Sequence, residues 1–205
     1  MVPATLTLPK VGPVRLSRRS TLNFLSAFCL ALSLFLFGQS AWIFGKAQVA
    51  QALLERAFAH AIVMGEPVKA WNWADTWPVA RIEISRIQAS AIVLHGGSGE
   101  ALAFGPALLD ETSRIGERGT AVVSAHRDTH FAFLKDVVVG DLISITRDDG
   151  LVFTYRVTGT SIVDWNKSGI DRHASGFNLV LTTCYPFDAI TRGSERYLVH
   201  AELVK

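Results

Sequence analysis

From Val79 onward the chain alternates between short apolar runs and turn-forming residues, and this pattern leaves few folds open. The runs are too short for most helices and are rich in Val, Ile and Thr, as β-strands are. Asp148-Asp149-Gly150 between two of them is a strong hairpin signal. We therefore predict a mainly β domain of about eight strands with short helices between them, closed into one barrel. The expected strands cover 79–84, 87–94, 120–125, 141–147, 151–158, 160–164, 178–183 and 196–204, with a helical turn within 101–109.

A second feature is the uncharged stretch from Phe24 to Phe44. As a helix rising about 1.5 Å per residue, it is long enough to cross a hydrocarbon core roughly 30 Å thick. The 23 residues before it contain four cations and no acidic residue, which predicts a cytoplasmic N-terminus and an exported domain. A cleavable signal peptide is the alternative. We favour a retained anchor because the apolar stretch continues past the small residues Gly38 and Ser40, and Trp42 suits a membrane interface.

The segment between anchor and barrel has two parts. Apolar residues recur at helical spacing from Gly45 to Ala61, either as a stalk or as a helix packed on the domain. A tryptophan-rich link follows at 71–78, which we interpret as an arm packed on the domain rather than a membrane-surface or ligand-stacking element. The predicted organisation is a basic N-terminus (1–23), a transmembrane helix (24–44), a helical stalk and link (45–78) and a β-barrel domain (79–205).

Charge and composition exclude one class of partner. The formal net charge is +2, which the four N-terminal cations exceed, so the remaining domain is slightly acidic. No broad basic surface is expected there, and nucleic acid is not an expected partner. Hydrophobic residues make up 49% of the chain, and the excess is concentrated in the predicted membrane segment.

Three side chains with useful chemistry stand at the ends of expected strands. Cys184 follows the apolar run ending at Leu181, His126 follows another such run, and Arg196 opens the last strand. Only two cysteines occur, and the other lies in the membrane segment, so Cys184 is expected to be unpaired. Together the three groups suit covalent acyl transfer: a thiolate attacks a carbonyl, a histidine protonates the leaving amine, and an arginine stabilises the oxyanion.

Four ordered segments carry a resemblance to a known family. Residues Leu181–Cys184 form most of a Thr-Leu-x-Thr-Cys motif, and Ala125–Leu134 form a histidine segment. A hairpin, Gly140–Val157, follows the histidine segment, and Arg196–Val199 place an arginine before an apolar strand. In these four segments the chain resembles the sortases, membrane-anchored cysteine transpeptidases of the bacterial envelope. The tryptophan link and the basic N-terminus are similar to those of sortases from Gram-negative bacteria. Ala125 departs from the pattern, since glycine is common before the histidine.

The resemblance implies an eight-stranded barrel with Cys184 as nucleophile, His126 as acid and base, and Arg196 as the positioning or oxyanion cation. It implies no cofactor and no metal. The expected partners are an exported protein with a C-terminal sorting signal, an amine acceptor in the envelope, and the lipid bilayer through residues 24–44. The expected location is the inner membrane, crossed once, with the catalytic domain in the periplasm. The substrate-binding candidates are Thr182, Thr183 and Arg127.

Several alternatives stay open on sequence grounds. Arg192 is a rival for the arginine role, Asp128 is a candidate for orienting His126, and His130 could join His126 and Cys184 in a zinc site. An L,D-transpeptidase should carry a Ser-His-Gly-Cys-type element, and a papain-like protease should place its cysteine before its histidine; the chain does neither. The main non-enzymatic alternative is an envelope adaptor that binds a partner through the tryptophan link.

Overall fold

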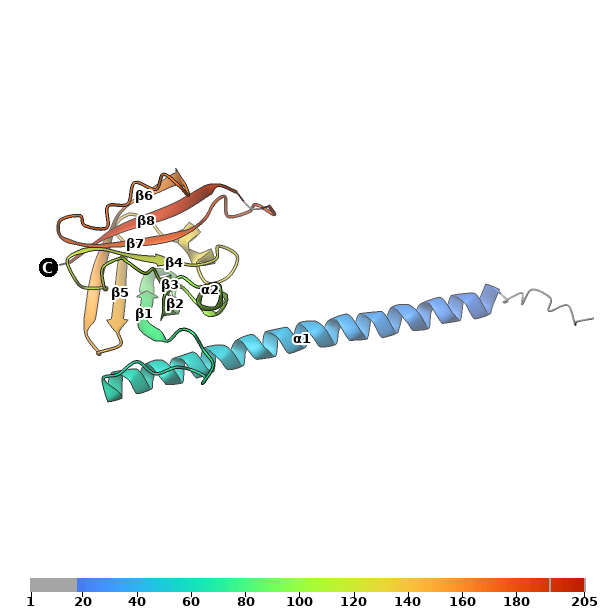
Figure 1. Cartoon of the computed structure of the whole chain (residues 1–205). Coiled ribbons are helices and arrows are strands. Elements are labelled where there is room, and N and C mark those ends of the chain that lie inside the picture. Colours follow the sequence, from blue (N-terminus) through green and yellow to red (C-terminus); the bar gives the residue numbers. More distant parts are fainter. Residues whose placement is uncertain (1–17, 192, 205) are drawn as a thin grey trace, which may run out of the picture. The chain divides into compact units, whose positions relative to one another are not determined.

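The computed structural model describes residues 18–191 and 193–204. The chain divides into two compact units, 1–46 and 47–205, and the division falls within helix α1 (Arg18–Met64). The second unit is the β-barrel (Figure 1). Its strands are β1 (Pro78–Ile84), β2 (Ala89–His95), β3 (Ala107–Leu108), β4 (Gly119–Ser124), β5 (Leu142–Arg147), β6 (Val152–Asp164), β7 (Phe177–Cys184) and β8 (Glu195–Leu203). Its short helices are η1 (Ser85–Ile87), α2 (Gly99–Phe104) and η2 (Ala132–Asp136).

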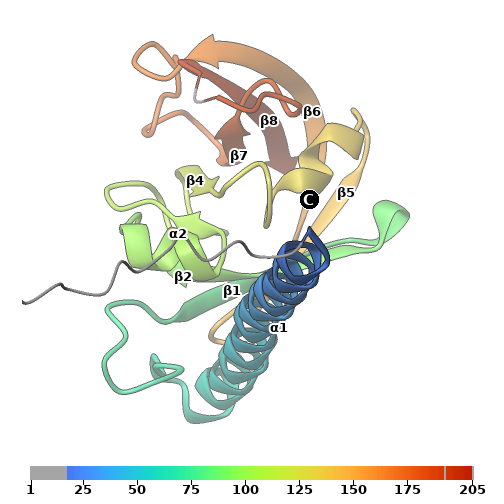
Figure 2. The ribbon, with the colours of Figure 1, turned by 90° about the vertical axis from the view of Figure 1, so that its right-hand side faces the viewer.

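The barrel closes in the order β1-β2-β3-β4-β7-β8-β6-β5, with β5 paired to β1. The β2–β3 and β4–β7 pairs are parallel and the others antiparallel, and β4, β7 and β8 lie side by side (Figure 2). The predicted closed eight-stranded barrel is confirmed, but two of its strands differ from expectation. β3 has only two residues, too few for a sequence pattern, and the two strands expected over 151–164 form the single strand β6, with a register shift between Val157 and Gly159.

Strand alternation builds the core. Alternate residues of β7 and β8, including Leu179, Leu181 and Val199, point into the barrel and are fully buried there. The other face of β4, β7 and β8 is also covered. Val122 and Val180 lie on this outer face. This double burial explains why β4 reads as a continuous apolar run.

The C-terminal part of α1, within the second unit, packs on the barrel. Leu54 and Phe58 are almost fully buried in one cluster with Ile92 and Leu94 of β2. The helix ends where Gly65 adopts a left-handed φ of +70° and its N–H bonds to the carbonyl of Ala61, a common glycine cap. The stalk alternative therefore does not describe residues 47–64, and a catalytic unit cut at residue 79 would lose this packing face.

The tryptophan link also packs on the barrel for the most part. Trp71 meets Phe104 edge-on with ring centroids 4.7 Å apart, and Trp77 stacks on His95 at 4.1 Å. Trp73 is 72% exposed. The interpretation of the link as a packed arm therefore describes Trp71 and Trp77 but not Trp73.

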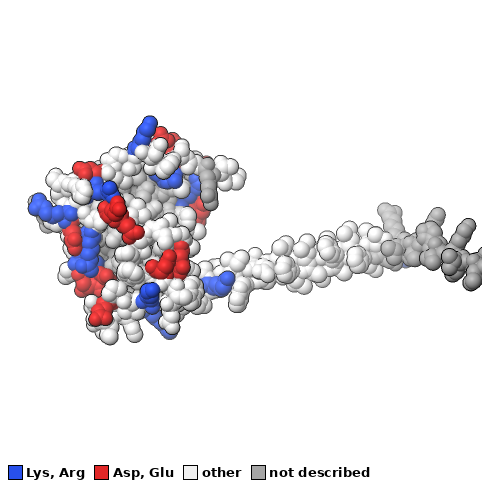
Figure 3. Space-filling view, in the orientation of Figure 1, with Lys and Arg blue, Asp and Glu red and all other residues white. Residues whose placement is uncertain are grey.

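In the first unit, residues 18–46 are helical, and their described side chains are exposed. By length and composition, α1 is the one described helix that is apolar enough to cross a membrane. Figure 3 shows a nearly uncharged surface along this helix, while acidic and basic side chains mix on the visible face of the barrel. Lys10 and Arg15 of the predicted basic N-terminus lie outside the described residues.

Candidate active site

Cys184 and Arg196 are direct neighbours across two antiparallel strands. Cys184 is the last residue of β7 and Arg196 the second residue of β8, and the register pairs them. Paired residues in a sheet project to the same face. The thiol and the guanidinium thus stand together at one end of the barrel, on the outer face that also carries Thr182 and Leu198. Both side chains are partly exposed.

The turn that carries His126 is fastened to β7 by its backbone. Ala125, just before the histidine, donates its N–H to the carbonyl of Thr182 at 3.2 Å. The Thr183 hydroxyl donates to the carbonyl of Ala125 at 2.7 Å. The carbonyl of His126 itself accepts the N–H of Phe131 at 3.0 Å, and Phe131 is fully buried in the core. These bonds hold the backbone of His126 beside the strand end that bears Cys184, while its side chain is exposed.

The three catalytic candidates have few side-chain partners. Within the part of the chain that the structure describes, the Arg196 guanidinium donates to nearby backbone through Nη1 alone, at 3.2 Å to the carbonyl of Gly193 and 2.9 Å to that of Glu195. Among the described residues, no hydrogen bond joins Cys184 to His126 or to Arg196.

His130, four residues after His126, is a neighbour of a different kind. Burial lowers the pKa of its imidazole, against an opposing hydrogen bond to the backbone of Ala103. The described residues contain no group of three or more His, Cys, Asp or Glu side chains that could hold a metal ion, so His126, His130 and Cys184 do not form one.

The structure gives the substrate-binding candidates other surroundings. Thr183 is 1% exposed and its hydroxyl is used by Ala125, so it supports the histidine turn from inside the barrel. Thr182 lies on the Cys184 face but is only 9% exposed. Arg127 is 7% exposed, and its guanidinium donates to backbone carbonyls of the segment after Cys184. The donors of Thr183 and Arg127 are thus engaged by backbone carbonyls around the site, and substrate binding by these two residues stays a prediction.

Two further sequence expectations concern the histidine turn. Asp128 is 70% exposed in its side chain and accepts a hydrogen bond from Arg127, and no hydrogen bond or ion pair links it to His126. The methyl group of Ala125, at the position where glycine is common in the family, lies in the barrel core. Arg192, the rival of Arg196, lies outside the described residues.

Sequence reasoning missed an apolar cluster on the sheet face that also carries Cys184. Val180 stands four residues before Cys184, and in a strand this spacing puts both on one face. With Val122 and Leu198 it forms a buried cluster, against which Leu109, Val163 and Ile170 pack. Because alternate residues of a strand share a face, the sequence alone could have placed Val180 on the face of Cys184. Its neighbours Val122 and Leu198 come from β4 and β8, so they can be identified only once the order of the strands in the sheet is known.

The closed barrel carries a cysteine, a histidine and an arginine at one end, and comparison with known proteins identifies its family. Residues 82–204 match the family model described as the sortase domain. The chain is 31% identical to sortase D of Bacillus subtilis (strain 168) over 125 residues, which span 60% of this chain and 62% of that protein.

Solved structures of sortases are also similar to this chain. Sortase C-1 from Actinomyces oris is 27% identical with a TM-score of 0.56, covering 62% of this chain and 75% of that one. A sortase D5 transpeptidase from Clostridium perfringens has a TM-score of 0.62 at 20% identity, covering 77% of this chain and 99% of that one, and shows the shared fold. The chain belongs to the sortase family. The narrower resemblance to sortases of Gram-negative bacteria stays a prediction.

Proposed function

We propose that this protein is a cysteine transpeptidase that cleaves a sorting signal near the C-terminus of an exported protein and transfers the acyl fragment to an amine. Membership of the sortase family supports the class of reaction. The observation that carries the assignment to residues is the pairing of Cys184 with Arg196, beside a histidine turn bonded to the same strand end.

The proposed reaction has two steps. Cys184 Sγ, as thiolate, attacks the scissile carbonyl carbon; a C–S bond forms, the C–N bond breaks, and His126 gives its proton to the departing amine. An incoming amine then attacks the thioester and loses a proton to His126, and Sγ leaves as thiolate. In both steps the guanidinium of Arg196 stabilises the negative charge on the carbonyl oxygen. Water in place of the amine gives hydrolysis.

We also propose that residues 24–44 anchor the protein in the inner membrane, with the N-terminus in the cytoplasm and the barrel outside. The length, hydropathy and exposure of this part of α1 support the anchor. A membrane-impermeant maleimide tests the orientation: it should label Cys184 in spheroplasts without detergent. Labelling only after the membrane is opened would place the barrel in the cytoplasm.

The function is tested with the full chain in detergent micelles, using a Cys29→Ser background so that Cys184 is the single thiol. The protein is mixed with a library of signal peptides and an amine, and mass spectrometry follows the products. The library should vary the residues on both sides of the cleaved bond.

We expect a covalent adduct on Cys184 that passes to the amine, and no product with Cys184→Ala. An adduct released only to water would indicate a hydrolase. No adduct across the library, with Cys184 slow to alkylate, would reject catalysis and favour the envelope adaptor.

A further inference from the structure

The side chain of Arg127 connects the segments that carry all three proposed catalytic residues. Its backbone belongs to the histidine turn, directly after His126. Its guanidinium Nη1 donates to the carbonyl of Pro186 at 2.7 Å, two residues after Cys184. Nη2 donates to the carbonyls of Ala189 and Thr191, further along the same β7–β8 segment towards Arg196.

These contacts form a specific, buried hydrogen-bond network. A guanidinium presents several N–H donors in a fixed planar fork. Here the fork reaches three carbonyls of one loop, spaced over six residues from Pro186 to Thr191, and Nε donates to Asp128 at 3.2 Å. Arg127 is 7% exposed, so the charge is buried with carbonyl dipoles and one carboxylate around it. Such a buried charge persists only when its surroundings are well ordered.

The β7–β8 segment has a second anchor on its other side. Tyr185 and Phe187 contact Tyr197 of β8, with ring centroids 6.2 and 5.2 Å from it. The aromatic contacts fix the segment to the barrel. Within the described residues, Arg127 is the side chain that joins the segment to the histidine turn through several hydrogen bonds.

We propose that Arg127 is a positioning residue for the acyl transfer: by clamping the β7–β8 segment to the histidine turn, it sets the placement of His126 relative to Cys184. The proposal rests on the proposed function and adds a residue to it. It also replaces the expectation that Arg127 binds substrate, because a clamp acts on the turnover step and not on substrate affinity. Loss of the clamp should therefore lower kcat and leave KM nearly unchanged.

The experiment compares Arg127→Ala with Arg147→Ala in the full chain. Arg147 is a matched control because it is also buried, at 8% exposure, and also joins a turn to a loop, at the other end of the barrel. Amide hydrogen exchange provides a readout that needs no activity. Arg127→Ala should speed exchange in 126–131 and 185–191 and leave the 147–151 hairpin unchanged, and Arg147→Ala should do the reverse.

Activity provides the second readout. We expect Arg127→Ala to lower kcat about 10- to 100-fold, with KM within about threefold of wild type. Guanidinium chloride at tens of millimolar should restore part of the activity by filling the vacated site, and the same concentration of sodium chloride should not. Arg147→Ala should retain kcat despite a lower Tm.

Three results would overturn the proposal: unchanged exchange at 185–191, a kcat no lower than that of Arg147→Ala, or a rise in KM alone. The last would restore direct substrate binding by Arg127. If the wild type forms no adduct on Cys184, the proposed function fails, and the exchange data still report separately whether Arg127 clamps the segment.

Discussion

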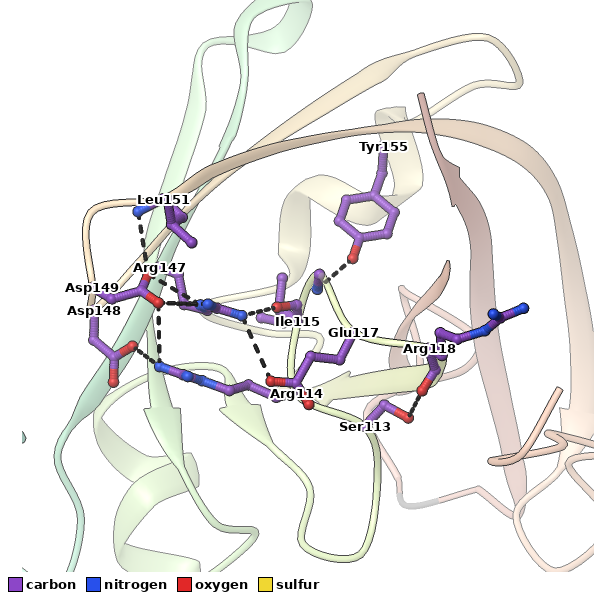
Figure 4. Close-up of polar contacts among 11 residues, drawn as sticks. Ser113, Arg114, Ile115, Glu117, Arg118, Arg147, Asp148, Asp149, Leu151 and Tyr155 are labelled. Atoms are coloured by element: carbon purple, nitrogen blue, oxygen red, sulfur yellow. Dashed lines mark hydrogen bonds and ion pairs between the residues drawn. The ribbon is translucent and has the colours of Figure 1, made fainter. Parts of the chain in front are cut away.

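At one end of the barrel, Arg147 donates hydrogen bonds to Asp149 and to the carbonyl of Ile115, and Arg114 pairs with Asp148 at 2.6 Å (Figure 4). The parallel register of β4 and β7 puts this network, before β4, opposite the end where Cys184 lies. There, by contrast, His126 is exposed and Arg196 donates only to adjacent backbone.

The difference shows two uses of charge in one small barrel. In the network around Arg147, ion pairs and hydrogen bonds between opposite charges join the β5–β6 hairpin to the loop before β4. At the end that bears Cys184, backbone hydrogen bonds and the side chains of Thr183 and Arg127 hold the segments together, while His126 is exposed and Arg196 is partly exposed. Because Thr183, Arg127 and backbone hydrogen bonds provide the order at this end, His126 and Arg196 are not needed to hold the fold, and under the proposed function they can interact with a substrate.

The largest effects should come from removing the unengaged groups. We expect His126→Ala to lower kcat/KM about 10³-fold, because proton transfer is lost in both steps. Arg196→Ala should lower it about 10²- to 10³-fold, because the oxyanion loses its cation. Steady-state transfer to a saturating amine measures both. Neither change should shift Tm by more than about 2 °C, since neither side chain has a buried partner.

Arg192→Ala is the comparison that decides between the two arginines. It should retain activity. If Arg192→Ala is inactive and Arg196→Ala is active, the assignment of the cation to the strand residue is wrong, and the loop residue takes its place.

The opposite pattern is expected at the other end of the barrel. Arg147→Ala leaves Asp149 without its partner and the carbonyl of Ile115 without its donor, which should destabilise the fold by about 2 kcal/mol. For a chain of this size that is a fall in Tm of about 4–8 °C. Thermal unfolding by circular dichroism measures it, with Arg118→Ala, an exposed change, as the control. An equal Tm for the two variants would show that the network does not hold the fold.

Features of the fold that depend on residues close together in sequence could be predicted, and features that depend on residues far apart in sequence could not. Runs such as 120–125 and 178–183 identify strands because buried strands are rich in apolar residues. The same runs predicted that Cys184, His126 and Arg196 stand at or just beyond strand ends, where the structure has them. β3 escaped prediction because two residues carry no period, and β6 was divided because Gly159, beside its register shift, reads as a break.

The hydrogen bonds that Thr183 and Arg127 make could not be predicted from local sequence, for a different reason. Thr183 and Arg127 look like polar residues next to reactive ones, which suggests contact with substrate. Their partners, Ala125 for one and Pro186 to Thr191 for the other, lie 58 to 64 residues away in sequence. Only the parallel pairing of β4 with β7 brings these segments together, and no local pattern encodes it.

The smallest predicted effect is the pH dependence of the stability that the Arg147 network contributes at its end of the barrel. The hydrogen bond from Arg147 lowers the pKa of Asp149 from 3.8 to about 2. Because the folded pKa lies below the unfolded one, the stabilisation is fully present above about pH 4 and disappears as the pH falls through 2. Asp149 is 34% exposed in its side chain, so solvent screening reduces the effect to about 1 kcal/mol. Urea unfolding should find Asp149→Asn less stable than wild type by this amount at pH 5 and equal to it at pH 2. A gap that persists at pH 2 would mean that Asp149 acts through its shape and hydrogen bonds, and that the Arg147 network does not owe its stability to charge.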